Sequence, residues 1–281
     1  MKIYLDHEVP QGSVQWHAIR LGIPTASRAK DVITAVKGDL SEARHKYGYQ
    51  LIAERILREP FATDVGHLQW VIHGKERESE AANAYADIMG VELTKVGFVS
   101  IDSGRWGCSP DRLVLTEGVR GAAEIKAPSE VVQIGYLLEG GPGKDYRQQV
   151  QMQISVCDLN WADFFSHNER CPPLRARFHP DDAYIKKLEA ALRTFADELD
   201  DGEERIRRLG LFSPAAKLAN DADRMADAMI ADIDRLRSLQ ETLDKGGDAE
   251  FVAALGTMPR EQQQRVREAI EANQALLRMG A

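Results

Sequence analysis

Three charged residues in the middle of the chain have the types and spacing that could cleave a phosphodiester. Asp111 lies in a predicted strand, 107–115, and Glu124 and Lys126 lie two residues apart on one face of the next, 122–127. Two carboxylates that meet in one place repel each other unless a cation lies between them. Oxygen ligands without histidine suit Mg²⁺, with Mn²⁺ as a substitute, and a nearby lysine can hold a water and neutralise charge on a phosphate.

The pairing of these two strands decides whether the three residues meet. If 107–115 pairs antiparallel with 122–127, Asp111 lies near Glu124. Lys126 is the only lysine of the chain with an acidic residue two positions before it. The alternative is a surface hairpin with a cross-strand ion pair, which contributes only ~0.2–1 kcal/mol. The three residues alone leave both interpretations open.

Composition limits the class of protein. The 281 residues are 43% hydrophobic, which is enough for one sizeable core and an appendage, and no apolar run reaches the length of a membrane span. A net charge of −8 argues against strong nonspecific binding to DNA, but not against an enzyme that holds DNA locally. The first residues contain no apolar segment of a signal peptide, and the three cysteines have no metal-ligand spacing, so we expect a cytoplasmic location.

The elements follow the order α, then β, then α, which predicts an α/β protein of the α+β kind with a mixed sheet and flanking helices. The predicted helices cover residues 13–21, 25–36, 41–58, 66–89, 129–138, 145–156 and 181–209. The predicted strands cover residues 91–101, 107–115, 122–127, 161–167 and 174–178. Thr25 is expected to cap the second helix, and Gly90 to end the fourth.

The chain beyond residue 210 has a different pattern. Apolar residues at steps of three and four predict an amphipathic helix there, with the stripe Leu218, Ala222, Met225, Met229, Ile233, Leu236, Leu239 and Leu243. A second helix is predicted from about residue 259 to 279, so 215–281 forms a helical hairpin beside a main domain of residues 1–210. We expect this extension to serve packing or assembly and to carry no catalytic group.

Five short segments, taken in order, resemble the phage lambda exonuclease and YqaJ-type viral recombinase family of PD-(D/E)xK nucleases. They are VQWHAIRLGIPTAS at 14–27, GKERESEA at 74–81, GCSPD at 107–111, EIKAP at 124–128 and YRQQVQMQ at 146–153. The resemblance covers about residues 10–180. It implies a restriction-endonuclease-like core and a Mg²⁺-dependent exonuclease that degrades one strand of linear duplex DNA from its 5′ end. It also implies a homotrimeric ring and a single-strand annealing protein as partner, in a bacterial host that carries the phage or prophage.

The resemblance assigns roles near the metal residue by residue. Asp111 and Glu124 match the metal ligands, the Ile125 carbonyl supplies a further oxygen, and Lys126 matches the residue that holds the attacking water. Glu78 matches a further acid near the metals, although without the family it would be part of a solvated helix face.

A glutamine-rich helix follows the two strands. Gln149 matches the glutamine that the family has at this place, and Tyr146, Gln149 and Gln153 share one helix face. In the family this face would turn toward the catalytic strands and position water or phosphate. Otherwise it is the solvated side of the helix.

The N-terminal segment would bind the end of the DNA. Arg20 and Ser27 match a pocket for the terminal 5′-phosphate, and Ser109 could join them. A guanidinium group clasps a phosphate through two hydrogen bonds, and hydroxyl groups complete the shell. Trp16 is expected to be a core anchor for this segment.

Three further residues are tentative DNA contacts: Lys37, Val71 and Tyr146. Lys37 either follows the duplex backbone or is simply solvated. Val71, with Ile72 beside it, lies where the family has an apolar wedge that separates the terminal base pair.

Departures from the family keep other functions open. Arg112 stands where the family often has glycine, and it either contacts phosphate or points outward. The extension at 215–281 lies beyond the resemblance. A structure-specific or restriction-like endonuclease on the same fold is one alternative. A non-catalytic scaffold that acts through its C-terminal helices is another.

Overall fold

The computed structural model describes residues 1–60 and 69–210 of the chain. The elements, in chain order, are β1 (Lys2–Leu5), α1 (Val14–Ile19), η1 (Ala26–Arg28), α2 (Ala29–Val32), α3 (Arg44–Leu57), α4 (Gln69–Met89), β2 (Leu93–Thr94), β3 (Val96–Ser100), β4 (Gly107–Cys108), β5 (Arg112–Thr116), β6 (Val119–Lys126), α5 (Glu130–Glu139), η2 (Gly143–Tyr146), α6 (Arg147–Cys157), β7 (Trp161–Asn168), β8 (Cys171–Phe178) and α7 (Asp182–Leu209). The helical hairpin predicted over 215–281 lies outside the described residues. None of the described helices combines the length and apolarity needed to cross a membrane.

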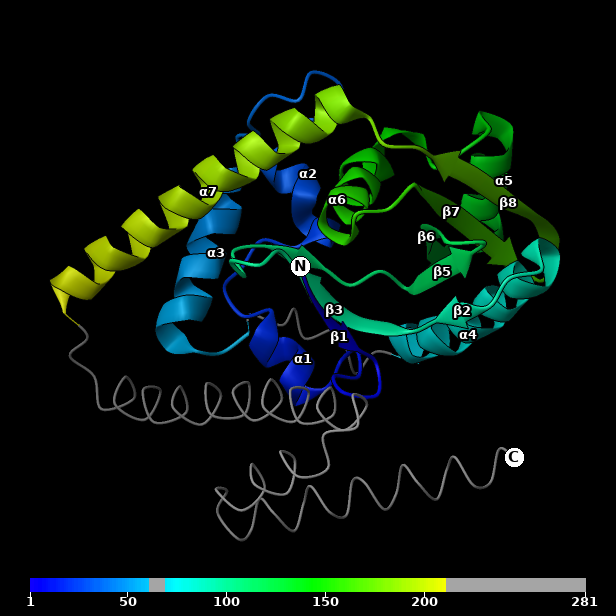
Figure 1. Ribbon diagram of the computed structural model, residues 1–281, viewed down its shortest axis with the longest axis horizontal. Coiled ribbons are helices and arrows are strands. Elements are labelled where there is room, and N and C mark those ends of the chain that lie inside the picture. Colours follow the sequence, from blue (N-terminus) through cyan, green and yellow to red (C-terminus); the bar gives the residue numbers. More distant parts are fainter. Residues whose placement is uncertain (61–68, 211–281) are drawn as a thin grey trace, which may run out of the picture. The chain divides into compact units, whose positions relative to one another are not determined.

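The strands form two sheets, with the orders β1-β3-β4 and β2-β5-β6-β7-β8 (Figure 1). In the larger sheet β5 and β6 are antiparallel, and their register pairs Arg112 with Ala123. The neighbouring strands β6 and β7 are parallel, and β7 and β8 are antiparallel. The predicted α+β class with a mixed sheet is therefore confirmed, and so is the antiparallel pairing on which the candidate site depends.

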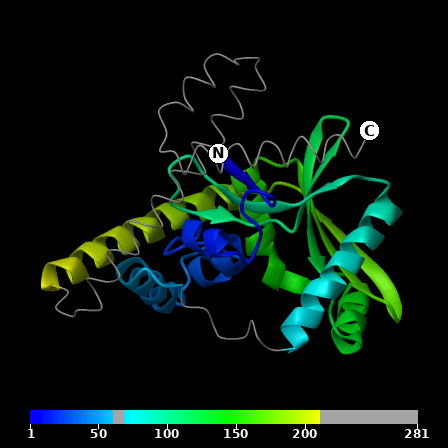
Figure 2. The same cartoon turned by 90° about the horizontal axis from the view of Figure 1, so that it is seen from below.

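Helices cover both faces of the larger sheet, with α4 and α6 on opposite sides (Figures 1 and 2). Ala123 and Ile125 of β6 belong to the hydrophobic cluster that α4 closes with Tyr85. Ala122 belongs to the other cluster, together with Met152 of α6. Because successive side chains of a strand point to opposite faces, Glu124 and Lys126 turn toward α6.

A hydrogen bond to a buried carboxylate fastens α4 to the sheet. Asp163 of β7 is fully buried and accepts two hydrogen bonds from Arg177, at 2.7 and 2.8 Å, and one from the Tyr85 hydroxyl at 2.8 Å. The Arg177 guanidinium also stacks on Trp161, 3.8 Å from the ring centroid. This network fixes the helix that carries Glu78 two turns before Tyr85.

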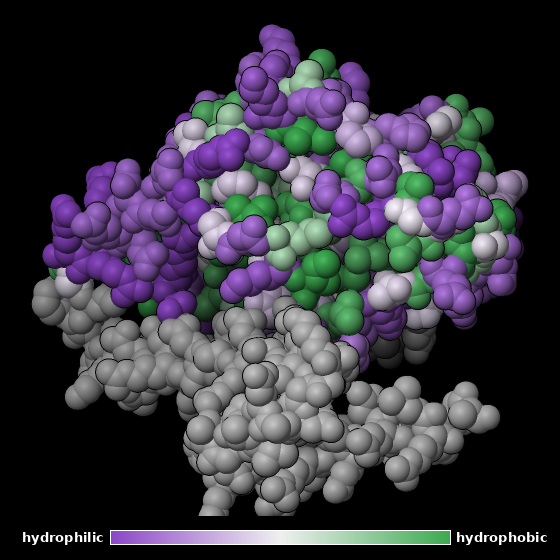
Figure 3. Space-filling model, viewed as in Figure 1, coloured by the Kyte–Doolittle hydropathy of each residue, from purple (hydrophilic) through white to green (hydrophobic). Residues whose placement is uncertain are grey.

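The long helix α7 packs on α3 through one apolar face. Phe195 stacks on Tyr47 with 5.6 Å between ring centroids, and Arg55 of α3 pairs with Asp200 and Glu203 beside that contact. The outward side of α7 is charged, and Figure 3 shows hydrophilic side chains over this end of the face. The predicted amphipathic helix at 181–209 is confirmed.

Two predicted strands are each split between the two sheets. Residues 91–101 divide into β2, in the larger sheet, and β3, in the smaller one. Residues 107–115 divide into β4 and β5, so Asp111 does not lie inside a strand but directly before β5. Pro110 explains the second break, because proline has no N–H group to donate to a strand ladder.

The predicted helix over 25–36 is confirmed only for residues 26–32. The chain forms η1 and the four-residue helix α2, and Ile33 is already extended and bridges to Leu40. Thr25 makes no capping hydrogen bond with its side chain. In contrast, Ser13 caps α1 by accepting from the Trp16 amide at 3.1 Å, and Gly90 ends α4 with a φ of +63° as predicted.

Candidate active site

The β5–β6 pairing brings the three predicted charged residues together. Asp111 Oδ2 accepts a hydrogen bond from the Ile125 amide at 2.7 Å, which ties the start of β5 to the end of β6. The Lys126 ammonium lies 3.7 Å from Asp111 Oδ2 and donates to Glu124 Oε1. Lys126 therefore bridges two carboxylates, one within β6 and one directly before β5.

Two glutamines of α6 fix Glu124 from the opposite side. Gln149 Nε2 donates to Glu124 Oε1 at 2.6 Å, and Gln153 Nε2 donates to Glu124 Oε2 at 2.7 Å. Glu124 is only 2% exposed, so these bonds replace the water that a strand glutamate would normally bind. The glutamine face of α6 turns toward the strands and is not the solvated side of the helix.

Burial and like charge make the pair of carboxylates electrostatically strained. Burial, then the nearby charges of Glu124 and Glu78, raise the pKa of Asp111 to about 8, although Lys126 and the Ile125 amide oppose this shift. For Lys126, burial alone would lower the pKa, but the attraction of Glu124 and Asp111 outweighs it and raises the pKa. The site therefore favours positive charge, and the Lys126 ammonium alone does not offset the negative charge of the neighbouring carboxylates.

These residues fit a divalent ion of the Mg²⁺ type by the chemistry of their donors. Asp111 and Glu124 offer hard oxygen atoms with no histidine or thiolate beside them, and burial together with the charge of Glu124 raises the pKa of Asp111, an effect that a bound cation would oppose. Within 1–60 and 69–210 no group of three or more histidine, cysteine or acidic side chains is arranged as a metal site. Any ion would thus depend on these two carboxylates together with backbone oxygen, water or DNA.

Glu78 and Arg112 lie beside this pair and bond to each other. Arg112 is 7% exposed, its Nη1 lies 3.5 Å from Glu78 Oε1, and it also donates to the Asp111 carbonyl at 2.6 Å. Arg112 therefore does not point outward, because a buried guanidinium needs acceptors within the protein. Glu78 is close enough to raise the pKa of Asp111.

Arg20 lines a cavity of about 190 Å³ that also contains Ser27, Ser109, Asp111 and Glu124. Its guanidinium stacks on the indole of Trp16 at 3.5 Å, and its buried Nε has no hydrogen-bond partner among the described groups. Burial lowers the pKa of Arg20 to about 10, and Tyr47, Glu54 and Cys108 only partly offset this. An anion in the cavity would satisfy this side chain.

The hydroxyl groups of this cavity are not equivalent. Ser109 Oγ donates to the Gly97 carbonyl at 2.7 Å and accepts from Trp16 Nε1 at 3.0 Å, so its proton is already committed. Ser109 thus holds the indole beneath Arg20, which differs from the predicted direct phosphate contact. Ser27 is exposed and lies 3.4 Å from the Thr25 hydroxyl. Trp16 is only half-buried, so it is a support for Arg20 more than a core anchor.

A wider opening of about 410 Å³ leads to Glu124 and Lys126 past Tyr146 and Gln149. Lys30 of α2 also lines it and is exposed, and no sequence pattern marked this residue. Lys37 is exposed, and its carbonyl accepts from Lys187 of α7 at 2.8 Å. The side chain of Val71 lies outside what the structure describes.

Asp111→Asn is expected to raise the thermal stability of the metal-free protein. The unfolded chain loses the Asp111 proton near pH ~4, whereas the folded protein keeps it up to about pH 8, so stability falls as pH rises through this range. Asparagine keeps an oxygen for the Ile125 amide without the charge. In EDTA at pH 8.5 the melting temperature should rise by ~2 °C or more, and the gain should shrink toward pH 5. A variant that melts below the wild type at pH 8.5 would contradict this.

Comparisons with known proteins agree on one family. A sequence model of the YqaJ-like viral recombinase domain matches residues 15–160. A search among curated protein sequences finds no match.

Solved structures of two exonucleases are similar to this chain. The alkaline exonuclease LHK-Exo from Laribacter hongkongensis is 31% identical, with a TM-score of 0.62 over 73% of this chain and 100% of that chain. Its complex with dAMP gives a TM-score of 0.61 at the same identity and coverage. A phage related exonuclease from Haemophilus somnus 129PT is 14% identical, with a TM-score of 0.50 over 64% of this chain and 96% of that chain, which concerns the fold alone.

Proposed function

Because the chain belongs to the YqaJ-like viral recombinase family, we propose that it is a Mg²⁺-dependent exonuclease that degrades one strand of linear duplex DNA from its 5′ end and leaves 3′ overhangs. Family membership and the similarity to an alkaline exonuclease support a DNA nuclease of phage-type recombination. One observation carries the proposal to this site: Asp111, Glu124 and Arg20 line the same cavity, and Lys126 bridges the two carboxylates.

Asp111 and Glu124 would hold Mg²⁺ or Mn²⁺, with the Ile125 carbonyl as a further oxygen and Glu78 as an acid close by. The ion, when bound, supplies charge that activates a water and stabilises the leaving 3′-oxygen.

Lys126 and Glu124 hold the attacking water in line with the phosphodiester bond, and the Lys126 ammonium offsets charge that develops on the phosphate. Gln149 and Gln153 keep the Glu124 carboxylate in one orientation through their bonds to both of its oxygens. Tyr146 lines the opening beside Lys126 and is a proposed DNA contact.

The end of the DNA would be held by Arg20 and Ser27, whose cavity reaches the two carboxylates. A terminal 5′-phosphate bound there sets the distance to the bond that is cut. Lys37 and Val71 are proposed to contact the duplex farther away. A trimeric ring, a single-strand annealing partner and a cytoplasmic site of action in the phage-carrying host complete the proposal.

Digestion of a 5′-phosphorylated linear duplex tests this function. We expect mononucleotide release and growing 3′ overhangs with Mg²⁺ or Mn²⁺, and none with EDTA or with Ca²⁺ alone. A closed circular duplex of the same sequence is the control and should stay intact. Cutting of the circle would favour the endonuclease alternative, and no cleavage of either substrate would contradict a nuclease.

A chain that ends at Gly210 is expected to keep metal-dependent cleavage. Every described residue of the candidate site lies before residue 158, and α7 contributes buried residues to the core from Tyr184 to Leu199. Single-turnover cleavage of a short duplex, measured beside the mass by light scattering, should lie within ~3-fold of the full chain, as for changes away from a site. Loss of single-turnover cleavage in a folded chain of this length would show that residues 215–281 reach the active site.

A further inference from the structure

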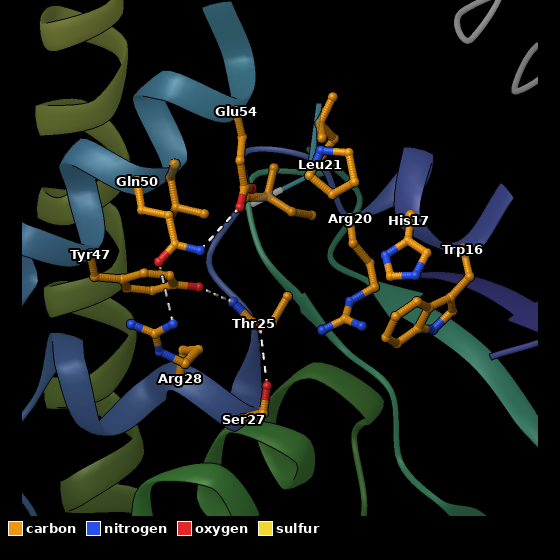
Figure 4. Close-up of a pocket in the computed structure, with 13 residues that line it drawn as sticks. Trp16, His17, Arg20, Leu21, Thr25, Ser27, Arg28, Tyr47, Gln50 and Glu54 are labelled. Atoms are coloured by element: carbon orange, nitrogen blue, oxygen red, sulfur yellow. Dashed lines mark hydrogen bonds between the residues drawn. The ribbon is translucent and has the colours of Figure 1, made fainter. Parts of the chain in front are cut away.

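A second cavity, of about 260 Å³, adjoins Arg20 between α1 and α3 (Figure 4). Figure 4 shows the guanidinium groups of Arg20 and Arg28 facing the same space from two walls, with Tyr47 and Gln50 of α3 behind Arg28. Arg28 is held in place by an ion pair with Asp31 and by stacking on Tyr47, 4.4 Å from the ring centroid. The terminal phosphate proposed to bind Arg20 lies in the cavity that holds Asp111 and Glu124, so it assigns no ligand to this second cavity.

The lining of this cavity is half polar and half apolar. Two arginines, the Gln50 amide and the Glu54 carboxylate supply polar groups, whereas Leu21, Ile23 and Leu51 form an apolar wall. The Glu54 carboxylate already accepts hydrogen bonds from Gln50 and from the Gly22 amide. A nucleoside joined to a phosphate has the same division, because its base and sugar carry apolar surface and its phosphate needs cations. The volume lies just below the ~300–1,000 Å³ typical of ligand pockets, which suits a single nucleoside.

The position of the cavity fixes which nucleoside it would take. It shares Trp16, Arg20, Thr25 and Ser27 with the cavity that holds Asp111 and Glu124. A phosphate bound to Arg20 would therefore lie between the two cavities, with Asp111 and Glu124 on one side and Leu21 on the other. The part of the DNA strand on the 3′ side of this phosphate occupies the cavity that holds Asp111 and Glu124. Only a nucleoside on the 5′ side of the phosphate can therefore enter the cavity beside Leu21.

We propose that this second cavity binds the nucleoside on the 5′ side of the phosphate that Arg20 holds. The inference rests on the proposed exonuclease function and adds a rule for the released product. At a 5′-phosphorylated end the terminal phosphate occupies Arg20, and the product is a 5′-mononucleotide. At a 5′-hydroxyl end the first internucleotide phosphate occupies Arg20, the terminal nucleoside enters the cavity, and the product is a dinucleoside monophosphate.

The same hydrolysis accounts for both products. Water attacks the phosphorus on the 3′ side of the released unit, and the bond from that phosphorus to the 3′-oxygen breaks. The 3′-oxygen leaves with a proton as a hydroxyl group, and the remaining strand keeps a 5′-phosphate. Every later cut of a 5′-hydroxyl strand therefore starts from a phosphorylated end and releases mononucleotides.

Mass spectrometry of the first product tests the inference on the unmodified protein. Full-length enzyme in excess over blunt duplex, with Mg²⁺, is quenched during the first turnover at 5′-hydroxyl and at 5′-phosphorylated ends. The expected products are the dinucleoside monophosphate and the mononucleotide, respectively. An unphosphorylated nucleoside as first product, or no cleavage of 5′-hydroxyl ends beside normal cleavage of phosphorylated ends, would overturn the inference alone. No cleavage of phosphorylated ends would overturn the proposed function as well.

Filling the cavity gives a second readout. Leu21→Trp and Ile23→Trp each place a large side chain against the apolar wall. Each should lower the first-turnover yield of dinucleoside monophosphate from 5′-hydroxyl ends by ~10-fold or more, the scale of losing one bound base. Leu115→Trp, at a side chain of β5 that is 68% exposed, is the matched control and should leave the yield unchanged. An unchanged yield in both folded cavity variants, checked by thermal melting, would overturn the inference.

Discussion

Asp111→Asn, Glu124→Gln and Lys126→Gln are each expected to lower the rate of cleavage by ~10²-fold or more. The first two remove a carboxylate charge that would hold the metal, and the third removes the ammonium that bridges both carboxylates. The substitutions keep the size of the side chain, so the loss should appear in the chemical step. Single-turnover kinetics on a 5′-phosphorylated duplex, with saturating enzyme, measure this step directly.

Glu117→Gln is the matched control, because this glutamate is exposed in the turn between β5 and β6 and makes the same change of charge. Its rate should stay within ~2-fold of the wild type, as for surface changes away from a site. Stabilisation by Mg²⁺ in a thermal melt gives a readout that does not depend on turnover. The assignment would be wrong if Asp111→Asn and Glu124→Gln cleaved at nearly the wild-type rate or kept the full stabilisation by Mg²⁺.

The core of the candidate site could be predicted because its geometry is local. Period two alone places Glu124 and Lys126 on one face of β6, and a single antiparallel hairpin brings Asp111 beside them. The glutamines at Gln149 and Gln153 follow from helical spacing in the same way. Each of these relations spans few residues and has one dominant solution.

The parts that could not be predicted depend on contacts between distant segments. The division of residues 107–115 between two sheets follows from pairing of β4 with β3 and of β5 with β6, which no single strand pattern encodes. Ser109 loses its predicted role because Gly97 and Trp16 take its hydrogen bonds. Arg112 is buried against Glu78 for a similar reason, and the opening beside Lys30 exists only once α2 lies near β6.

The proposed recognition of the DNA end depends on Arg20, a buried side chain whose Nε lacks a hydrogen-bond partner among the described groups. Arg20 carries a charge in a position where burial lowers its pKa to about 10, and its Nε finds no partner among the described groups. A protein keeps such an arrangement at a cost in stability, since a buried donor without an acceptor is unfavourable by ~1–3 kcal/mol. Trp16 and Ser109 hold the guanidinium in place, which would be unnecessary for an arginine that only contacts solvent.

Arg20→Ala is therefore expected to erase the preference for 5′-phosphorylated over 5′-hydroxyl ends. The ratio of initial rates on the two substrates should fall toward 1, because the terminal phosphate carries a charge of about −1.5 to −2 and loses a stronger contact with the guanidinium than the singly charged internucleotide phosphate of a 5′-hydroxyl end. Arg20→Lys should restore only part of the ratio, since an ammonium cannot grip a phosphate with two parallel bonds.

Arg120→Ala provides the comparison, because this half-exposed arginine of β6 pairs with Asp158 and lines none of the cavities described here. It should leave the ratio of rates unchanged. Removal of the guanidinium should also make the metal-free protein no less stable, as the buried charge disappears with its unsatisfied donor. An unchanged ratio in a folded Arg20→Ala variant would mean that Arg20 supports Trp16 and the wall of the cavity, and that the terminal phosphate is bound by other groups.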